Sequence, residues 1–228
     1  MNKEKGLLIV IEGVDGVGKT TAIRSAVAQL KAMGYDIAAT GETMANVEGL
    51  DNTFGATLFN MIKLQSTQEQ ADPTSQSLMI ASARRAHYRN VLKPLLNAGK
   101  IVVMDRFFLS TYYNYQSECL KNGQIYALAM GTFKPDYTIV LRADPKVAEQ
   151  RIQQRGAALH CTDHSAPTSI DQLQTSVLTN VRNNPGFVID ANREADIVAT
   201  DLVDQILYAA DELRGYATLQ AAHYAPLF

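Results

Sequence analysis

The chain has 228 residues, a length that suits one α/β domain with or without insertions. Hydrophobic residues make up 46% of it, enough for a core, and the net charge of −2 at pH 7 counts against tight, nonspecific binding of nucleic acid. There is no apolar run of the roughly 18 residues that a membrane helix needs, and MNKEKG at the start is followed by too few apolar residues for a signal peptide. The two cysteines, Cys119 and Cys161, lie far apart in the sequence, and we expect a cytosolic α/β chain to keep them reduced. We therefore expect a soluble, cytoplasmic protein that does not bind membranes.

The first predicted strand leads straight into a glycine-rich motif. Residues 7–11, LLIVI, form an apolar run that suits a strand buried on both faces. Residues 13–20, GVDGVGKT, match G-x-x-x-x-G-K-[ST] at every fixed position, and a helix is expected from Lys19 to about Met33. In this pattern the loop N–H groups and the lysine bind phosphates, the hydroxyl suits Mg²⁺, and the helix N-terminus favours the same anion. The residues expected to bind a nucleoside triphosphate are Gly13, Val14, Asp15, Gly16, Val17, Gly18, Lys19, Thr20 and Thr21.

Strands and helices alternate along the rest of the chain. We expect further strands at 35–40, 101–104, 137–141 and 187–190, and further helices at 53–65, 73–98, 145–156, 169–182 and 195–213. Pro94 should kink or end its helix early, while Asp144 and Pro145 are a typical N-cap and first helical residue. The polar connection after Gly156 has the length of a mobile lid. This alternation predicts an α/β fold with a parallel, five-stranded, doubly wound sheet flanked by helices.

From about Leu7 to Leu207 the sequence resembles the thymidylate kinase family of P-loop nucleoside monophosphate kinases. Three segments carry the resemblance: EGVDGVGKTT at 12–21, the stretch from Ala83-Arg84 to DRFFLST at 105–111, and the helix that begins with DP at 144–145 and contains two further arginines. The resemblance implies the P-loop kinase fold in a single domain, 1–228, with a short lid at about 156–168. It also implies phosphoryl transfer from ATP, with Mg²⁺.

Phosphoryl transfer needs positioning and charge neutralisation more than covalent chemistry. Asp105 follows a buried strand and either orients metal-bound water, accepts a proton from the acceptor, or merely caps the strand end. Arg106 offers a planar fork to the acceptor or to the transferring group. The resemblance adds Arg151 and Arg155 as lid arginines that close over the phosphates. We expect catalysis to rest on Lys19, Asp105, Arg106 and Arg155, metal binding on Thr20 and Asp105, and ATP binding on Arg151 besides the loop.

The acceptor side departs from the family's pattern. Phe59 stands where the family has an arginine for the acceptor's phosphate, Ile80 stands where an aromatic residue stacks on the base, and residues 41–43 read GET instead of Arg-Glu-Pro. The family has a tyrosine beyond the segment at 105–111, and in this sequence Tyr113, Asn114 or Tyr115 takes its role. In the family, the residues matching Asp15 and Arg84 meet the sugar hydroxyl and the base. The candidate acceptor-binding residues are Asp15, Phe59, Ile80, Arg84, Arg106 and Tyr115.

Three functions therefore remain open. The first is phosphorylation of a deoxynucleoside monophosphate, with dTMP as the leading candidate. The second is a kinase of the same fold that acts on a hydroxyl of a modified pyrimidine such as 5-hydroxymethyluracil, free or within DNA, because a hydroxyl acceptor has no monophosphate to clamp. The third is a non-catalytic nucleotide-binding module, against which the retained Asp15, Lys19, Asp105 and Arg106 argue. The expected partner is a small-molecule nucleotide, nucleic acid belongs only to the second function, and a homodimer stays open.

Overall fold

The computed structural model describes residues 6–41, 49–66, 73–107, 134–154 and 186–214. Its five strands form one sheet in the order β2-β3-β1-β4-β5, and every neighbouring pair is parallel. The strands are β1 (Leu7–Glu12), β2 (Ile37–Gly41), β3 (Ile101–Asp105), β4 (Tyr137–Arg142) and β5 (Gly186–Asp190). The predicted five-stranded, parallel, doubly wound sheet is confirmed. The predicted lid at 156–168 and the helix at 169–182, as well as Tyr115 and Arg155, lie outside the described residues.

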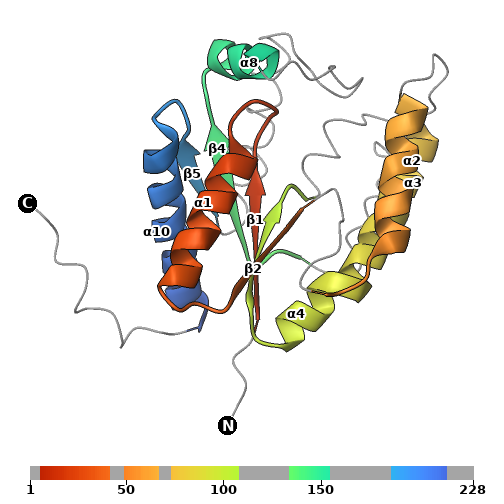
Figure 1. Ribbon diagram of the computed structural model, residues 1–228, viewed down its shortest axis with the longest axis horizontal. Coiled ribbons are helices and arrows are strands. Elements are labelled where there is room, and N and C mark those ends of the chain that lie inside the picture. The colour runs from red at the N-terminus through yellow and green to blue at the C-terminus, as the bar shows by residue number, and fades with distance from the viewer. Residues whose placement is uncertain (1–5, 42–48, 67–72, 108–133, 155–185, 215–228) are drawn as a thin grey trace, which may run out of the picture.

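Helices cover both faces of the sheet (Figure 1). The described helical segments are α1 (Lys19–Ala32), α2 (Thr53–Ser66), α3 (Pro73–His87), η1 (Tyr88–Leu92), α4 (Lys93–Asn97), α8 (Pro145–Gln154) and α10 (Ala195–Arg214). In Figure 1, α1 and α10 lie on one side of the sheet and α4 on the other, while α2 and α3 run side by side next to it. None of the helices in the described part of the chain has the length and apolar character needed to cross a membrane.

The central strand β1 is buried on both faces, as its apolar run predicts. One core cluster joins Leu7, Ile9 and Ile11 to apolar residues of α1 and α10. A second cluster on the opposite face joins Leu8 and Val10 to apolar residues of η1 and α4. Because side chains alternate between the two faces of a strand, a continuous apolar run supplies both cores at once. The sheet is therefore packed on both faces, and the described residues that follow β1 and β3 extend from this core.

The predicted helix at 73–98 is interrupted. The structure divides it into α3, the π-helical segment η1 and α4. In η1, the Lys93 N–H bonds to the carbonyl of Tyr88, five residues back, and Pro94, which has no N–H, comes next. The widened turn therefore lies just before the proline. A smaller difference concerns β2, which begins at Ile37 rather than at 35, because the Tyr35 N–H still bonds to the carbonyl of Leu30 at the end of α1.

Candidate active site

The loop between β1 and α1 packs closely against α8. Gly16 lies at the tip of this loop with φ of 77°, and a Cβ atom built on it would lie 2.2 Å from the Ala148 carbonyl oxygen. Gly18, with φ of 97°, is the N-cap of α1 and has open space around it. Both conformations are ones that L side chains rarely adopt, so glycine is required at these positions for different reasons. The motif thus forms a tight loop whose tip rests on the α8 backbone.

Lys19 is buried beneath this loop. Its Nζ donates hydrogen bonds of 2.8 Å to the carbonyl oxygens of Gly13 and Val14, and its side chain is 5% exposed. Burial lowers the pKa of the Lys19 ammonium to about 8, and the positive charge of Arg106 acts in the same direction, while nearby carboxylates act in the opposite direction. The ammonium therefore lies at the floor of the loop, in a poorly solvated position where a negatively charged ligand would be strongly attracted.

Thr20 and Asp105 meet across the site. The Thr20 hydroxyl donates a 2.8 Å hydrogen bond to Asp105 Oδ2, which joins the first turn of α1 to the end of β3. Asp105 Oδ1 is buried and has no hydrogen-bond partner among the described residues. A hydroxyl oxygen beside an unsatisfied carboxylate oxygen fits a hard cation that takes oxygen ligands, such as Mg²⁺. Within the described ranges, no group of three or more His, Cys, Asp or Glu side chains is arranged to hold a metal. Among the described residues, Thr20 and Asp105 are therefore the groups that would hold Mg²⁺ here.

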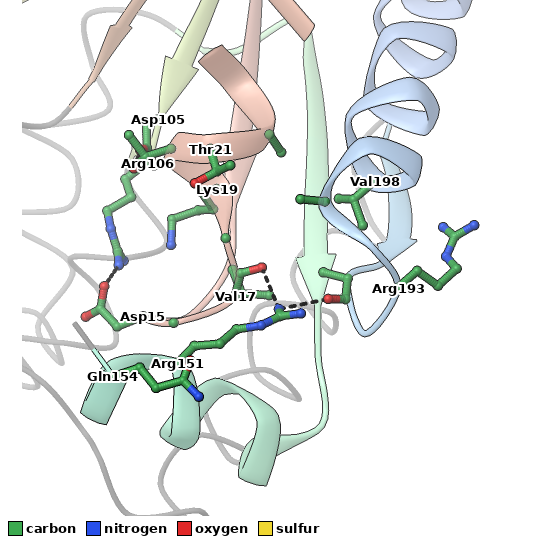
Figure 2. Close-up of a pocket in the computed structure, with 16 residues that line it drawn as sticks. Asp15, Val17, Lys19, Thr21, Asp105, Arg106, Arg151, Gln154, Arg193 and Val198 are labelled. Atoms are coloured by element: carbon green, nitrogen blue, oxygen red, sulfur yellow. Dashed lines mark hydrogen bonds and ion pairs between the residues drawn. The ribbon is translucent and has the colours of Figure 1, made fainter. Parts of the chain in front are cut away.

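Arg106 adopts an unusual backbone conformation that directs its side chain into the site. Its φ is 66°, the only positive value for a non-glycine residue in the described part of the chain. Its N–H donates a 3.0 Å bond to the carbonyl of Ile11, and its guanidinium forms an ion pair with Asp15 (Figure 2). Left-handed arginine is strained, and such strain persists only where the surroundings hold it in place. The resulting pair brings a cation from the β3 turn onto the glycine-rich loop.

The next residue of that turn, Phe107, is held through its backbone. Its N–H donates a 3.0 Å hydrogen bond to Glu12 Oε1, and its carbonyl oxygen accepts a bond from Arg84 Nη2. The Arg84 guanidinium also lies 5.7 Å from the centroid of the Phe107 ring. Glu12 and Arg84 are both buried, with 1% and 3% of their surfaces exposed. A buried acid at the end of β1 and a buried arginine on α3 are thus linked through the backbone of one residue.

A cavity of about 420 Å³ joins most of these groups. It is lined by the glycine-rich loop and the start of α1 (15–22), by the β3 turn (Asp105, Arg106), by α8 (Arg151, Gln154), and by the segment after β5 (Ala191, Arg193, Ala195, Val198). Figure 2 shows Lys19, Asp105 and Arg106 at one end of it, and Val198 and Arg193 at the other. The structure thus brings together ten candidate residues around one space: Asp15, Gly16, Val17, Gly18, Lys19, Thr20, Thr21, Asp105, Arg106 and Arg151.

The wall after β5 is a part of the site that was not predicted from the sequence. Arg151 Nη1 donates to the carbonyl of Ala191 at 2.9 Å and to that of Val17 at 3.4 Å, so one guanidinium ties α8 to both sides of the cavity (Figure 2). Asn192 supports the same wall, because its Oδ1 accepts a 2.7 Å bond from the Asp144 N–H. In a doubly wound sheet, ligands bind beyond the carboxyl ends of the strands. The sequence signal that could have located this wall is therefore the polar stretch that follows β5.

Three proposed acceptor residues lie away from the cavity lining. Ile80 is 1% exposed and packs in an apolar cluster between α2 and α3, and Phe59 is partly buried against the same cluster. Arg84 is buried beside Phe107. The described cavity is consequently the one formed by the triphosphate-binding loop, and α2 and α3 form a separate wall of the molecule with their own small core.

Comparison with known proteins agrees with this geometry. Residues 11–202 match the family model described as "Thymidylate kinase". The chain is 28% identical to the thymidylate kinase of Ruegeria pomeroyi, over 89% of this chain and 95% of that protein. It is 30% identical to the thymidylate kinase of Caulobacter vibrioides, over 89% and 97%, and 31% identical to that of Legionella pneumophila, over 89% and 94%. The chain therefore belongs to the thymidylate kinase family.

Proposed function

We propose that this protein transfers the γ-phosphoryl group of ATP to dTMP and so produces dTDP. The observation that carries the proposal is the cluster of Lys19, Thr20, Asp105 and Arg106 around one cavity at the carboxyl end of a parallel sheet. Membership of the thymidylate kinase family supports the same reaction. The groups are those that phosphoryl transfer needs, because the reaction depends on holding phosphates in line and neutralising their charge.

On the donor side, the loop N–H groups and Lys19 bind the triphosphate. Lys19 is held on two carbonyl oxygens at the loop floor, so it exchanges these contacts for phosphate oxygens when the nucleotide binds. Thr20 and Asp105 would hold Mg²⁺, which when bound neutralises charge on the phosphate oxygens. Arg151 fixes the cavity wall through its bonds to Val17 and Ala191 and leaves its guanidinium plane beside the nucleotide.

On the acceptor side, Arg106 and Asp15 form the part of the site that faces both substrates. Their ion pair stands at the junction of the loop and the β3 turn. We propose that Arg106 contacts the acceptor's phosphate, Asp15 its sugar hydroxyl, and Arg84 its base. Arg155 and the segment at about 156–168 complete the proposal as a lid that supplies further positive charge during transfer, within a single catalytic domain. Phe59 and Tyr115 belong to the acceptor side of the proposal as aromatic contacts, and Ile80 supports Phe59 from the core between α2 and α3.

The test is a screen of the purified protein with ATP and Mg²⁺ against dTMP, the other nucleoside monophosphates, thymidine, 5-hydroxymethyldeoxyuridine and DNA that contains 5-hydroxymethyluracil. We expect ADP and dTDP to form in equal amounts with dTMP, and Lys19→Met to abolish both. Phosphorylation of a hydroxymethyl compound with dTMP inert would replace the proposal with a hydroxyl kinase. ATP binding without turnover of any acceptor would leave a nucleotide-binding module.

We also propose that the protein forms a homodimer through α2. Phe54, Met61 and Leu64 lie on one side of this helix and are 61%, 50% and 68% exposed. Large apolar side chains gathered on one helix face are typical of a surface that contacts another protein, and a second copy of the chain offers the same surface in return. Sedimentation should give the mass of a dimer for the parent protein and of a monomer for Leu64→Glu. A monomeric parent at micromolar concentration would contradict the proposal.

A further inference from the structure

The backbone of Phe107 connects the two halves of the proposed active site. Its N–H bonds to Glu12, the last residue of β1, and its carbonyl bonds to Arg84 on α3. Glu12 directly precedes the glycine-rich loop. Phe107 therefore links β1, which leads into the glycine-rich loop, to α3, which carries Arg84, the arginine proposed to contact the base.

The same turn also carries the groups that enter the cavity. Asp105 reaches Thr20 and Arg106 reaches Asp15, while Phe107 turns away into the core with 3% of its surface exposed. Arg106 holds a left-handed backbone conformation, which needs outside contacts to persist. The bond from the Phe107 N–H to Glu12 fixes the turn immediately after the strained residue. Without this hydrogen bond, neither the Arg106 side chain nor the Phe107 carbonyl would be held in its present orientation.

We infer that Glu12 is a positioning residue for acceptor binding, which acts through the Phe107 backbone on Arg84 and through the same turn on Arg106. The inference rests on the proposed function, because it assigns Arg84 and Arg106 to the acceptor. We assign Glu12 no substrate contact of its own, because it is 1% exposed and its Oε1 already accepts the Phe107 N–H. The Glu12 carboxylate orients Phe107, whose carbonyl oxygen in turn holds the Arg84 guanidinium in place.

A functional role and a purely structural role predict different kinetics. If Glu12 only stabilised the fold, its loss would lower the amount of folded enzyme and leave both Michaelis constants unchanged. If it positions the acceptor groups, its loss raises the KM for dTMP and leaves the KM for ATP nearly unchanged, because Lys19 and the loop keep their contacts. Displacing a binding group by about 1 Å can cost on the order of 10²-fold in rate. An effect of about 10–100-fold in kcat/KM for dTMP is therefore expected.

The experiment compares Glu12→Leu with Glu12→Gln, Arg84→Met and the double variant Glu12→Leu/Arg84→Met. Leucine keeps the volume and removes the hydrogen-bond acceptor, whereas glutamine keeps an acceptor for the Phe107 N–H. We expect Glu12→Leu to raise the KM for dTMP about 10-fold or more with the KM for ATP within about 3-fold of the parent's, and Glu12→Gln to restore most of the loss. The double variant should bind dTMP little worse than Arg84→Met alone, since Glu12 acts on dTMP through the Phe107 backbone that holds Arg84. Ile9→Val, a core change in the same strand, is the control for lost stability.

A second measurement keeps the inference separate from the identity of the substrate. Hydrogen exchange of the Phe107 amide should be slow in the parent and in Glu12→Gln, and faster in Glu12→Leu, whatever the enzyme phosphorylates. If this amide stays equally protected in Glu12→Leu, the link from Glu12 to Phe107 is wrong even where dTMP is the substrate. Single-variant effects on the KM for dTMP that simply multiply in the double variant, or an equal rise in the KM for ATP, would also overturn it. A parent that is inert toward dTMP but shows the expected exchange pattern would refute the proposed function and support the link.

Discussion

The Thr20 hydroxyl and the Asp105 carboxylate are hydrogen bonded at 2.8 Å, although 85 positions separate them in the chain. The contact exists because β1 and β3 are parallel neighbours, with Ile11 opposite Asp105, so that the start of α1 and the end of β3 lie at the same edge of the sheet. The second carboxylate oxygen of Asp105 is buried without a partner in the described structure. An unsatisfied buried oxygen is costly, and a ligand that satisfies it will be bound firmly.

Replacing Asp105 by asparagine tests this relationship. Asn keeps the shape and an oxygen for Thr20 but removes the negative charge, so we expect kcat to fall by a factor of roughly 10²–10⁴ while ATP binding changes little. Asp136→Asn is the matched control, because Asp136 accepts a 2.9 Å bond from the Leu8 N–H at the opposite end of the sheet. Steady-state kinetics and ATP titration of both variants give the answer. Loss of ATP affinity with chemistry intact at saturation would make Asp105 a structural residue.

Lys19→Met should separate function from stability. Methionine matches the length of the buried lysine stem but carries no charge, and the parent ammonium already loses solvation in its position. We therefore expect turnover to fall by at least about 10²-fold, with a melting temperature that is unchanged or higher. Lys100→Met, which breaks a surface ion pair with Asp36, is the control and should leave turnover near the parent's value. Near-parental turnover of Lys19→Met would contradict the assignment of the phosphate-binding loop.

The packing of the loop tip on α8 gives a third prediction. Gly16→Ala places a methyl group against the Ala148 carbonyl, so the loop and α8 must move apart. Gly34→Ala is the matched control, because Gly34 has φ of 90° but no atom within 4 Å of the position that a Cβ would take, and it therefore measures backbone strain alone. That strain costs about 1–2 kcal/mol. We expect Gly16→Ala to destabilise the protein by more than Gly34→Ala, and to raise the KM for ATP, which Gly34→Ala leaves unchanged. Equal effects in denaturant unfolding and in kinetics would show that the contact with α8 is unimportant.

The parts of this molecule that depend on short stretches of sequence were predictable. The loop at 13–20 and the buried strand before it are read directly from consecutive residues, and the order of strands and helices implied the doubly wound sheet that the structure has. Asp144 was predicted to cap a helix, and its Oδ1 accepts a 2.8 Å bond from the Lys146 N–H in the first turn of α8. In each case the determining contacts lie within a few residues of one another.

The parts that depend on tertiary contacts were not predictable. No sequence signal marks an arginine for the left-handed conformation that Arg106 adopts, because that conformation is imposed by Ile11 and by the ion pair with Asp15. The sequence predicted no role for Glu12 beyond its place in the segment at 12–21, since its partner Phe107 lies 95 positions away. The position of the segment after β5 beside the cavity depends on the sheet order, which places β4 beside β1 and β5 beside β4. Local patterns therefore located the phosphate-binding loop, and long-range contacts determined the rest of the site.

His87 provides the last prediction, a dependence of stability on pH. It is 1% exposed, its Nε2 shares a 2.8 Å hydrogen bond with the Thr40 hydroxyl, and burial followed by the charge of Arg84 lowers its pKa from 6.5 to about 4. Between these two values the unfolded chain binds a proton that the folded protein does not. The free energy of unfolding should therefore rise with pH from about 4 to 6.5. The part of it that His87 contributes is lost as the pH falls through this window. At pH 5 the loss due to His87 is about 2 kcal/mol relative to pH 7.5.

His87→Gln isolates this contribution, because glutamine can still bond to Thr40 but does not titrate. Urea unfolding of both proteins at pH 7.5 and at pH 5 gives four free energies of unfolding. We expect the parent to lose about 2 kcal/mol more than the variant between the two pH values, since all other titrating groups are shared and cancel in the difference. An equal loss in both proteins would mean that the His87 pKa is ordinary in the folded state. Its imidazole would then be protonated beside Arg84 at pH 5, which its burial and that neighbouring charge both oppose.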